Sequence, residues 1–389
     1  MATTVILGTG IMGLSTAYYL VQHQPASTIH LVDSSPRLFA SASGFAGGFV
    51  AKDWFVHSVS PLGALSFDEH AKLAEQHDGR QAWGYSRTRA VDYDPREGGD
   101  SSSDEGENGP EGPSWLKRVQ GDTLRHMDDG TGTAIVDPLK LCQFLLKYCT
   151  EAGVQLHHPA TALSVTTDVR GELASVRMGY TDSSAEVEIP ATRLLIASGA
   201  WTPSVFESLF VDSTTTIPVD SYGGHSLVVK SSDLKENMEE HHCWSVYLSI
   251  DEHPLELYSR ADGMIYIAGV NSPDTPLPPL ATSATTQQSC IDELRSIAGR
   301  FISSNDAPEI VRQGLCFRPI TTSGTPIVTR LDDEELGGIR TRPGQDGGVF
   351  VATGHGPWGI SLSLGTGKVM AELMQGMPQS ADITGLGLQ

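Results

Sequence analysis

The stretch Thr4-Val5-Ile6-Leu7-Gly8-Thr9-Gly10-Ile11-Met12-Gly13 decides the fold of this chain. A short apolar run leads directly into the pattern Gly-x-Gly-x-x-Gly, and a helical stretch follows from about Met12 to Gln22. A second strand-like run, Ile29 to Val32, ends in Asp33. In such a unit the first glycine allows a sharp turn, the second lets the backbone approach a pyrophosphate, and the third lets helix and strand pack closely. The stretch therefore predicts a βαβ unit that binds a dinucleotide.

Asp33 narrows the choice of nucleotide. It stands twenty residues after Gly13, where a carboxylate can accept hydrogen bonds from an adenosine ribose. The pyrophosphate would lie on the N–H groups at the start of the helix, near Ile11 and Met12. The fingerprint alone allows NAD, NADP or FAD, and the acid at position 33 favours a ribose without a phosphate.

The composition indicates a globular protein whose partners are neither nucleic acids nor membranes. The 389 residues include 47 acids against 26 bases, a formal charge of -21, whereas binding of nucleic acid or anionic lipid needs basic patches. No run approaches the roughly 18 apolar residues of a membrane helix. The N-terminus lacks the basic region of a signal peptide, and the C-terminus lacks a peroxisomal Ser-Lys-Leu. We therefore expect a cytoplasmic protein with no integral membrane segment.

The cysteines and histidines indicate neither a disulfide framework nor a metal site. The five cysteines are scattered and form no Cys-x-x-Cys pair, which is typical of reduced thiols. Cys142 and Cys149 share one face of a helix expected from Asp137-Pro138 to about Gly153, so we expect both in the core. The pairs His157-His158 and His241-His242 have no acids at metal-ligand spacing.

The order of expected elements divides the chain into two interleaved domains. Helices are expected at 62–77, 285–301 and 358–374, and strands at 154–157, 163–167, 193–197, 226–230, 244–250, 255–259, 264–268, 326–329 and 348–352. An α/β beginning, a β-rich middle and a return to α/β predict a discontinuous nucleotide-binding domain of residues 1–60, 135–205 and 310–389. Residues 61–134 and 206–309 would form a substrate domain.

Residues 95–113 differ from the rest of the chain. They carry six acids against one base and no apolar side chain to bury. This composition predicts a flexible acidic insertion on the surface. Docking of a protein partner through 95–113 is the alternative.

Four further segments make a resemblance specific. They are Ser41–Gly48, Leu195–Trp201, Cys316–Ile327 and Gly354–Ile360. In this order, after the opening fingerprint, they resemble the D-amino-acid oxidase, glycine oxidase and sarcosine oxidase family of FAD-dependent oxidoreductases. The resemblance extends from residue 4 to about 376 and leaves out 95–113. It implies an α/β fold, with a Rossmann-like FAD-binding domain of the glutathione-reductase type and an inserted antiparallel β-rich substrate domain.

The resemblance also implies a cofactor, a reaction and a set of contacts. FAD would accept a hydride at flavin N5 from a small amino acid or secondary amine, giving an imine, with O2 as the expected electron acceptor. The helix that begins in Gly354–Ile360 would direct its N–H groups and dipole at the flavin. The residues expected to contact FAD are Gly8, Gly10, Ile11, Met12, Gly13, Asp33, Ser34, Ser41, Ser43, Gly44, Ala46, Gly47, Gly48, Val165, Ser198, Gly199, Trp201, Arg318, Gly354, His355, Gly356, Trp358, Gly359 and Ile360.

Arg318 is the expected substrate residue. In the amino-acid oxidases the arginine of a Phe-Arg-Pro or Leu-Arg-Pro motif pairs with the substrate carboxylate, a contact that suits the guanidinium fork. Its alternative is a structural arginine that bridges to an acid. His225 lies on a strand that often lines the substrate pocket in this family, and Tyr258 and Arg260 resemble polar strand positions over the flavin ring.

Cys316 raises the possibility of a covalent flavin. Sarcosine-oxidase-type members attach the flavin to a cysteine five residues before the matching threonine, and Cys316 stands five before Thr321. Arg318 aligns the chain with the glycine oxidase branch, which has no such link, so a buried thiol is the favoured interpretation.

A second function stays open at this point. The chain could be a flavoprotein kept for regulation or protein interaction, with weak or no turnover, and the acidic 95–113 favours that alternative. An NAD-dependent dehydrogenase is a third option, but it explains neither Ser41–Gly48 nor the late glycine-rich turn.

Overall fold

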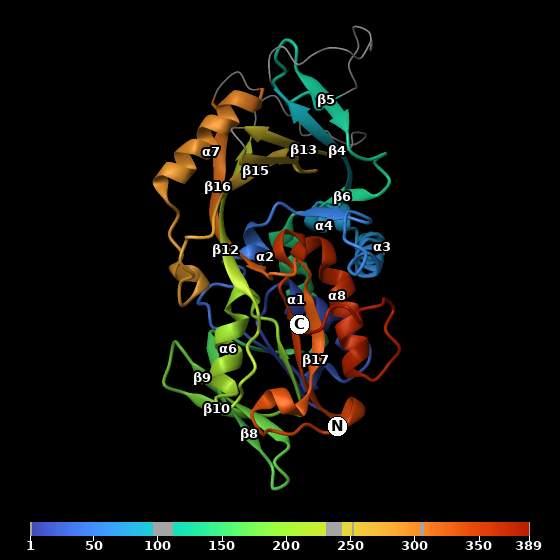
Figure 1. The fold of residues 1–389 in the computed structure, drawn as a ribbon, viewed down its shortest axis with the longest axis vertical. Helices are drawn as coiled ribbons and strands as arrows, with labels where there is room; N and C mark the ends of the chain where they lie inside the picture. The colour runs from blue at the N-terminus through green and yellow to red at the C-terminus, as the bar shows by residue number, and fades with distance from the viewer. Residues whose placement is uncertain (1, 96–111, 231–242, 251–252, 304–306, 389) are drawn as a thin grey trace.

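The computed structural model describes residues 2–95, 112–230, 243–250, 253–303 and 307–388. Figure 1 shows a lower α/β part that holds both ends of the chain, and an upper part built around a large sheet. Most of the expected acidic insertion, 95–113, lies outside the described residues.

β1 (Thr4–Leu7) is the centre of a six-stranded sheet. It lies between β2 (Ile29–Val32) and β11 (Arg193–Ile196), and β7 (Gln155–His157) and β18 (Gly348–Thr353) extend the sheet on the two sides, all in parallel. At the edge β17 (Ile327–Leu331) runs antiparallel to β18. Because the winding reverses at β1, a crevice for a ligand forms at the carboxyl ends of β1 and β11. This is the predicted Rossmann-like arrangement.

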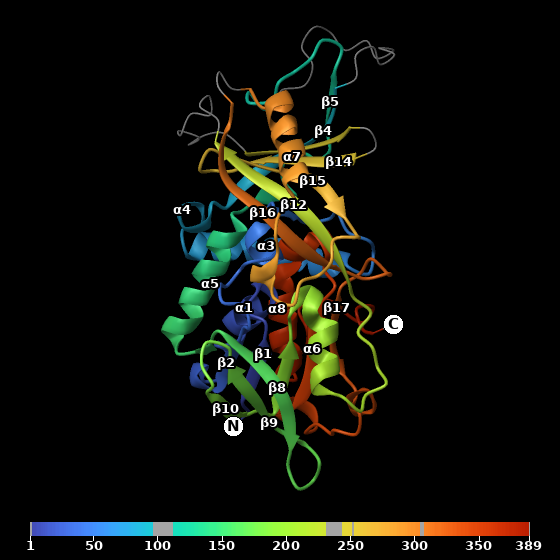
Figure 2. The same cartoon turned by 90° about the vertical axis from the view of Figure 1, so that its left-hand side faces the viewer.

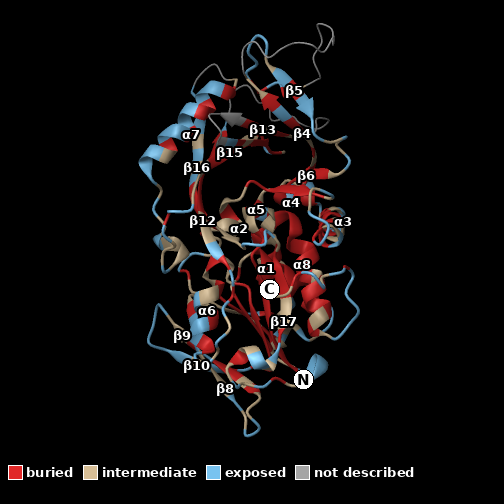
Figure 3. Cartoon of the chain, in the orientation of Figure 1, coloured by how far each residue is buried: buried red, intermediate tan, exposed pale blue. Residues whose placement is uncertain are grey.

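Alternate residues of β1 enter two different cores. Ile6 packs with the helices α1 (Ile11–Leu20), α5 (Pro138–Ala152) and α8 (Gly359–Met374). Val5 and Leu7 point to the other face, which is covered by α6 (Thr202–Leu209) and an antiparallel sheet of β8 (Ala160–Thr167), β9 (Leu173–Tyr180) and β10 (Glu186–Pro190). Figure 3 shows this interior as buried. A strand covered on both faces needs apolar residues in succession, which explains why β1 shows no polar alternation.

α5 begins and ends at local signals in the sequence. The Asp137 carboxylate accepts hydrogen bonds from the N–H groups of Leu139 (3.0 Å) and Lys140 (3.2 Å), and Pro138 occupies the first turn. The helix ends at Gly153, whose φ of +106° lies in the left-handed region. Cys142 and Cys149 are fully buried on its inner face, which confirms their predicted core role. α3 (Ser60–Gln76) packs against α8, and α4 (Gly79–Trp83) packs against α5.

The upper part is a larger, mainly antiparallel sheet. Its neighbours in order are β16 (Glu309–Ile320), β12 (Asp220–Lys230), β15 (Met264–Ser272), β14 (His253–Ser259) and β13 (Cys243–Ile250). β13 then pairs in parallel with β4 (Ser86–Asp94), and β6 (Thr133–Ile135), β3 (Phe49–Ala51) and β5 (Thr123–His126) complete the sheet. α7 (Gln288–Phe301) lies across one face (Figure 2), where Ile291 and Leu294 share a core with Leu227. The opposite face carries Tyr258 and Tyr266.

The expected elements agree with the structure best where a helix is involved. α3, α5, α7 and α8 begin and end within three residues of the expected bounds. β8 begins three residues earlier than expected and β12 six residues earlier, whereas β4, β9, β10 and α6 had no expected counterpart. The division into two domains stays a prediction. Its boundary at 310 falls within β16, which belongs to the larger sheet. No helix in the described part of the chain is long and apolar enough to cross a membrane.

Candidate active site

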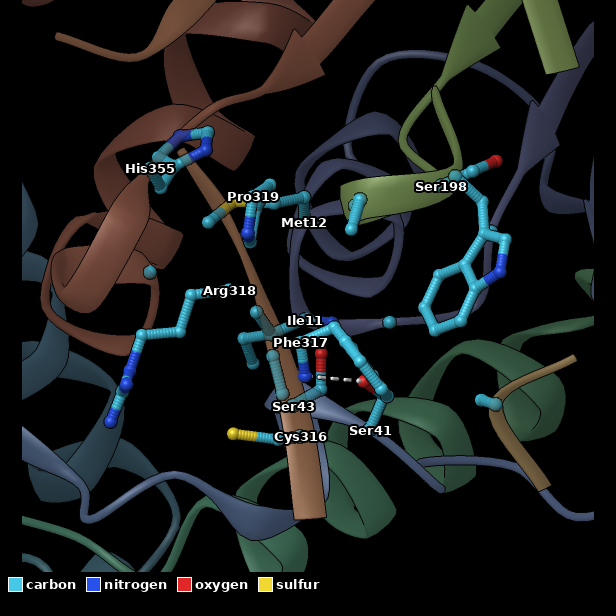
Figure 4. A pocket seen from close by; sticks show the side chains of 18 of the residues that line it. Ile11, Met12, Ser41, Ser43, Ser198, Cys316, Phe317, Arg318, Pro319 and His355 are labelled. Carbon is cyan, nitrogen blue, oxygen red and sulfur yellow. Dashed lines mark hydrogen bonds between the residues drawn. The ribbon is translucent and has the colours of Figure 1, made fainter. Parts of the chain in front are cut away.

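A cavity of about 640 Å³ lies between the two sheets. One end, the Asp33 end, is lined by Asp33, Ser34, Ser35 and residues 160–162 of β8. The other, the Arg318 end, is lined by Trp54, Tyr247, Glu256, Tyr258, Tyr266 and Arg318 from the larger sheet and the loop after β3. Between them lie the glycine loop, residues 39–43 and 46–49, the Ser198–Trp201 turn and the start of α8. Figure 4 shows these segments converging on one space.

The glycine loop leaves the start of α1 open to a ligand. Gly8 has φ +105°, a left-handed conformation that side chains disfavour. Gly10 has no side chain to cap α1, and Gly10, Ile11 and Met12 line the cavity, so the start of the helix and its dipole face it. The N–H of Ile11 donates to the Ser43 hydroxyl (3.0 Å), and a Cβ on Gly10 would lie 2.9 Å from that same oxygen. Ser43 therefore connects the glycine loop to the residue 41–48 segment.

Asp33 is oriented by the backbone on both sides of it. Its two oxygens accept hydrogen bonds from the N–H groups of Thr9 and Ser35, each at 3.0 Å. Burial raises the pKa of the carboxyl group despite these bonds. Each carboxylate oxygen keeps a further lone pair, which suits acceptance of a ribose hydroxyl.

The backbone of residues 41–48 lies against the larger sheet. Ser41 accepts a hydrogen bond from the N–H of Phe317 (3.2 Å), drawn as a dashed line in Figure 4. A Cβ on Gly47 would lie 2.6 Å from the ring of Tyr258 and 2.8 Å from that of Tyr266, so a larger residue would not fit. Arg260 donates to the carbonyls of Ala46 and Gly47. The 41–48 segment is therefore fixed as a flat wall of backbone and small side chains.

Arg260 acts behind this wall and does not line the cavity. It is buried, with 3% of its side chain exposed, and its guanidinium forms an ion pair with Asp137 at 3.2 Å. Asp137 also caps α5, so one carboxylate joins the start of that helix to the larger sheet.

His355 is a buried, neutral member of the late glycine-rich turn. Burial lowers its pKa to about 3, so the ring carries no charge at neutral pH. Its Nε2 lies 3.0 Å from the Thr366 hydroxyl, and its Nδ1 has no hydrogen-bond partner among the described residues. The 3₁₀ turn Gly356–Trp358 follows and leads into α8 without a side-chain cap.

Arg318 faces the cavity without an acidic partner. Its Nη1 donates to the Asn271 side-chain oxygen (2.8 Å), and no ion pair to Arg318 occurs within the described ranges. Figure 4 shows Arg318 and Cys316 pointing to the same side of β16. Burial lowers the pKa of Arg318, but Cys316, Tyr266 and Glu256 together outweigh this effect, so the pKa is raised overall. A neutral amide fixes the guanidinium and leaves its charge available for an anion.

Most of the residues predicted for the site meet at this cavity. Those that line it are Gly8, Gly10, Ile11, Met12, Asp33, Ser34, Ser41, Ser43, Ala46, Gly47, Gly48, Ser198, Gly199, Trp201, Cys316, Arg318, His355, Gly356, Trp358, Gly359 and Ile360.

Five predicted residues do not line it. Val165 packs on the core beneath β8, and residues 160–162 of the same strand reach the cavity instead. His225 is buried, with its Nε2 accepting the N–H of Gln287 (3.1 Å), so the geometry gives it a structural contact and not a pocket position. Gly13, Gly44 and Gly354 pack against neighbouring backbone or side chains behind the lining.

Sequence reasoning missed several lining residues. Trp54, Tyr247, Glu256 and Tyr266 lie at the Arg318 end, and Asn271 holds the guanidinium. Two-residue alternation in 255–259 could have placed Glu256 beside Tyr258 on one face. Their position over the cavity depends on pairings between strands, which a single sequence does not show.

The cysteines and histidines of the described ranges do not gather into a metal site. No group of three or more His, Cys, Asp or Glu side chains suited to a metal ion occurs there. The described cysteines are free thiols, and Cys316 is buried beside Arg318.

Comparison with known proteins identifies the family. The model of a family described as "DAO: FAD dependent oxidoreductase" matches residues 3–373. A Schizosaccharomyces pombe protein provisionally named an oxidoreductase is 28% identical over 402 residues, which cover 97% of this chain and 96% of the relative.

Two solved structures share the fold. Glycine oxidase from Geobacillus kaustophilus superposes with a TM-score of 0.72 at 18% identity, covering 100% of this chain and 98% of that one. L-proline dehydrogenase from P. horikoshii superposes with a TM-score of 0.70 at 14% identity, covering 99% of this chain and 96% of that one. Because the family model spans nearly the whole chain, including both sheets and the cavity between them, the chain belongs to the DAO family of FAD-dependent oxidoreductases.

Proposed function

We propose that this protein oxidises the C–N bond of a small amino acid or secondary amine that carries a carboxylate. The observation that carries the proposal is Arg318, a guanidinium that faces the cavity, is held by the neutral Asn271 and has no acidic partner among the described residues. A carboxylate that binds there forms a charge-assisted, bidentate pair, the strongest class of contact a guanidinium makes.

FAD is the expected cofactor, because the family is FAD-dependent. The lining fits it at three places: the start of α1, the oriented Asp33 carboxylate, and the flat wall at Gly47. When bound, FAD supplies the hydride acceptor, and we propose that O2 then takes the electrons. We propose that Ser198, Gly199 and the start of α8 complete the cofactor site.

The chain's own residues bind, orient and enclose the substrate. Arg318 fixes the carboxylate, and with it the position of the neighbouring C–N bond. Burial, followed by the nearby Glu256 carboxylate, raises the pKa of Tyr247 and of Tyr258 well above the usual value. Both phenols therefore stay protonated at neutral pH and can donate hydrogen bonds. The stacked rings of Phe49, Tyr258 and Tyr266 line the same end of the cavity and present aromatic faces to it.

We further propose that the cofactor is held without a covalent link to Cys316. Burial raises the pKa of this thiol, so it is protonated at neutral pH and is a poor nucleophile. Acid precipitation of the purified protein distinguishes the two cases. A yellow supernatant is expected, whereas a yellow pellet would contradict the proposal.

The function is tested by anaerobic mixing with a panel of D-, L- and N-methyl amino acids. We expect at least one carboxylate-bearing amine to bleach the flavin absorbance and, on admission of air, to release hydrogen peroxide. Bleaching without peroxide, but with reduction of an added dye, would show a dehydrogenase and overturn the choice of O2. If FAD is bound and no amine bleaches it, the enzyme proposal fails and a non-catalytic flavoprotein takes its place.

A further inference from the structure

Glu256 introduces a negative charge into the end of the cavity that also carries Arg318. On β14, Glu256 and Tyr258 are two residues apart and therefore point to the same face of the sheet. Glu256 pairs with Tyr247 of β13, and Tyr258 pairs with Tyr266 of β15. Directly paired residues share a face, so these four side chains belong to one surface, and all four line the cavity.

Arg318 reaches the same surface from β16. It lies two residues from Cys316, which pairs with Gly224 of β12. Two strands, β12 and β15, separate β16 from β14 in the sheet. The two charges act on one another, since Glu256 contributes to the raised pKa of Arg318, but no ion pair joins them. The two opposite charges therefore line the same end of the cavity without an ion pair between them.

The Glu256 carboxylate has no partner among the residues that the structure describes. It accepts no hydrogen bond and forms no ion pair with any residue that the structure describes, although the side chain is half-buried. A partly desolvated carboxylate without a partner is costly, and a bound cation removes that cost.

The residues around Glu256 are those that bind organic cations. Trp54 and Tyr247 lie with ring centroids 5.7 Å apart, and Tyr247 and Tyr258 are 5.6 Å apart. Phe49 contacts all three rings. Electron-rich aromatic faces attract ammonium and guanidinium groups, and a carboxylate at their edge adds the full charge.

We propose that Glu256 determines specificity by binding a second, cationic group of the substrate, so that the preferred substrate is an amino acid with an ammonium or guanidinium side chain. The inference rests on the proposed function and names its substrate class. The group at Glu256 is not the reacting amine, because loss of a hydride from carbon requires a neutral nitrogen and a carboxylate beside it would retain the proton. Arg318 and Glu256 thus bind the two ends of one dipolar molecule.

The test measures binding without turnover. FAD-loaded protein is titrated anaerobically with straight-chain carboxylates of four to six carbons, each paired with its ω-amino counterpart, for example pentanoate and 5-aminopentanoate. Perturbation of the flavin absorbance reports each Kd. We expect the ω-amino acid of the best-fitting length to bind about 10-fold more tightly than its uncharged partner, the range of a charge-assisted contact.

Two matched variants test whether Glu256 causes the tighter binding of the ω-amino acid. Glu256→Gln keeps shape and volume and is expected to reduce the preference to less than about 2-fold, while pentanoate still binds. Glu293→Gln makes the same change of charge on the exposed outer side of α7 and is expected to leave the preference intact.

The proposal is overturned if no ω-amino acid binds more tightly than its uncharged partner, or if Glu256→Gln retains the preference. Either result leaves the proposed function standing when a neutral amino acid bleaches the flavin. Conversely, a preference abolished by Glu256→Gln together with an absence of bleaching by every amine would contradict the proposed function alone.

Discussion

At the scale of the residue, Arg318 differs from Arg260 in the charge of its partner and in its access to the cavity. Arg260 is paired with Asp137, whereas Arg318 is held by the neutral side chain of Asn271. An uncompensated charge away from water is costly, and the guanidinium of Arg318 lies at the wall of the cavity, where a bound anion can reach it. The partner of Arg318 is therefore expected to be the substrate.

Replacement of Arg318 tests this directly. Arg318→Met keeps the length of the side chain and removes its charge, so KM for the best carboxylate substrate should rise about 10- to 100-fold, the worth of a charge-assisted contact. Arg318→Lys should recover part of the loss. Steady-state kinetics on a carboxylate substrate and on a matched amine without the carboxyl group checks the prediction, which an equal change in both KM values would contradict.

Site residues were predictable from sequence where backbone chemistry determines them. Gly8, Gly10 and Asp33 form a local pattern with fixed spacing, whereas the role of Arg318 was expected from the resemblance to the amino-acid oxidases. Tyr247, Glu256 and Tyr266 come together only through the register of three strands. His225 was expected in the pocket, but its side chain lies on the other face of β12. There it contacts Gln287, in the segment before α7.

At the scale of the element, the start of α5 joins helix capping to the larger sheet. The Asp137 carboxylate accepts two N–H bonds of the first turn and also forms the ion pair with Arg260. Arg260 in turn holds the carbonyls of Ala46 and Gly47. The Asp137 side chain therefore caps α5, neutralises the buried guanidinium of Arg260 and, through Arg260, supports the cavity wall at Ala46 and Gly47.

Two variants of Asp137 separate these contributions. Asp137→Asn keeps a capping oxygen but leaves Arg260 without a counter-charge, and removal of one partner of a buried pair costs about 3–5 kcal/mol. Asp137→Ala loses in addition the cap, worth about 1 kcal/mol. Urea denaturation gives both values. If Asp137→Asn were as stable as the wild type, the ion pair would contribute nothing.

Elements were predictable where side-chain period and end signals agree. α5 has an acidic cap, a proline in its first turn and a terminal glycine, and its bounds were found within a residue. β9 and β10 alternate less clearly, because they form a small sheet with a partly exposed face. β12 extends six residues before its apolar run, since Asp220–His225 pairs with β16 through residues that are not apolar.

At the scale of the whole molecule, buried histidines make stability depend on pH. Burial lowers the pKa of His70 to about 4 and that of His355 to about 3, against 6.5 for the ordinary side chain. The pKa of His30 is also lowered to about 4, first by burial and then by the neighbouring His157. These rings are neutral in the folded protein, while the unfolded chain takes up protons below pH 6.5.

The folded state should therefore lose stability as the pH falls from about 6.5 toward 4, and be unaffected by these groups above 6.5. Each fully buried ring contributes roughly 2 kcal/mol of loss between pH 6.5 and 5, since one pKa unit corresponds to about 1.4 kcal/mol. Urea denaturation at pH 7.5, 6 and 5 measures how steeply the free energy of unfolding falls with pH. His70→Gln should reduce this slope, and an unchanged slope in that variant would show that His70 titrates normally.

The larger sheet has a consequence for synthesis on the ribosome. β4 ends at Asp94, and its parallel neighbour β13 begins only at Cys243, about 150 residues later. At about 5–20 residues per second, β4 waits roughly 7 to 30 seconds for that partner to be translated. Apolar residues of β4 that are buried in the finished protein, Ala90 and Val91 among them, are without this partner throughout that interval. We therefore expect the nascent chain to depend on chaperones until most of its length has left the ribosome.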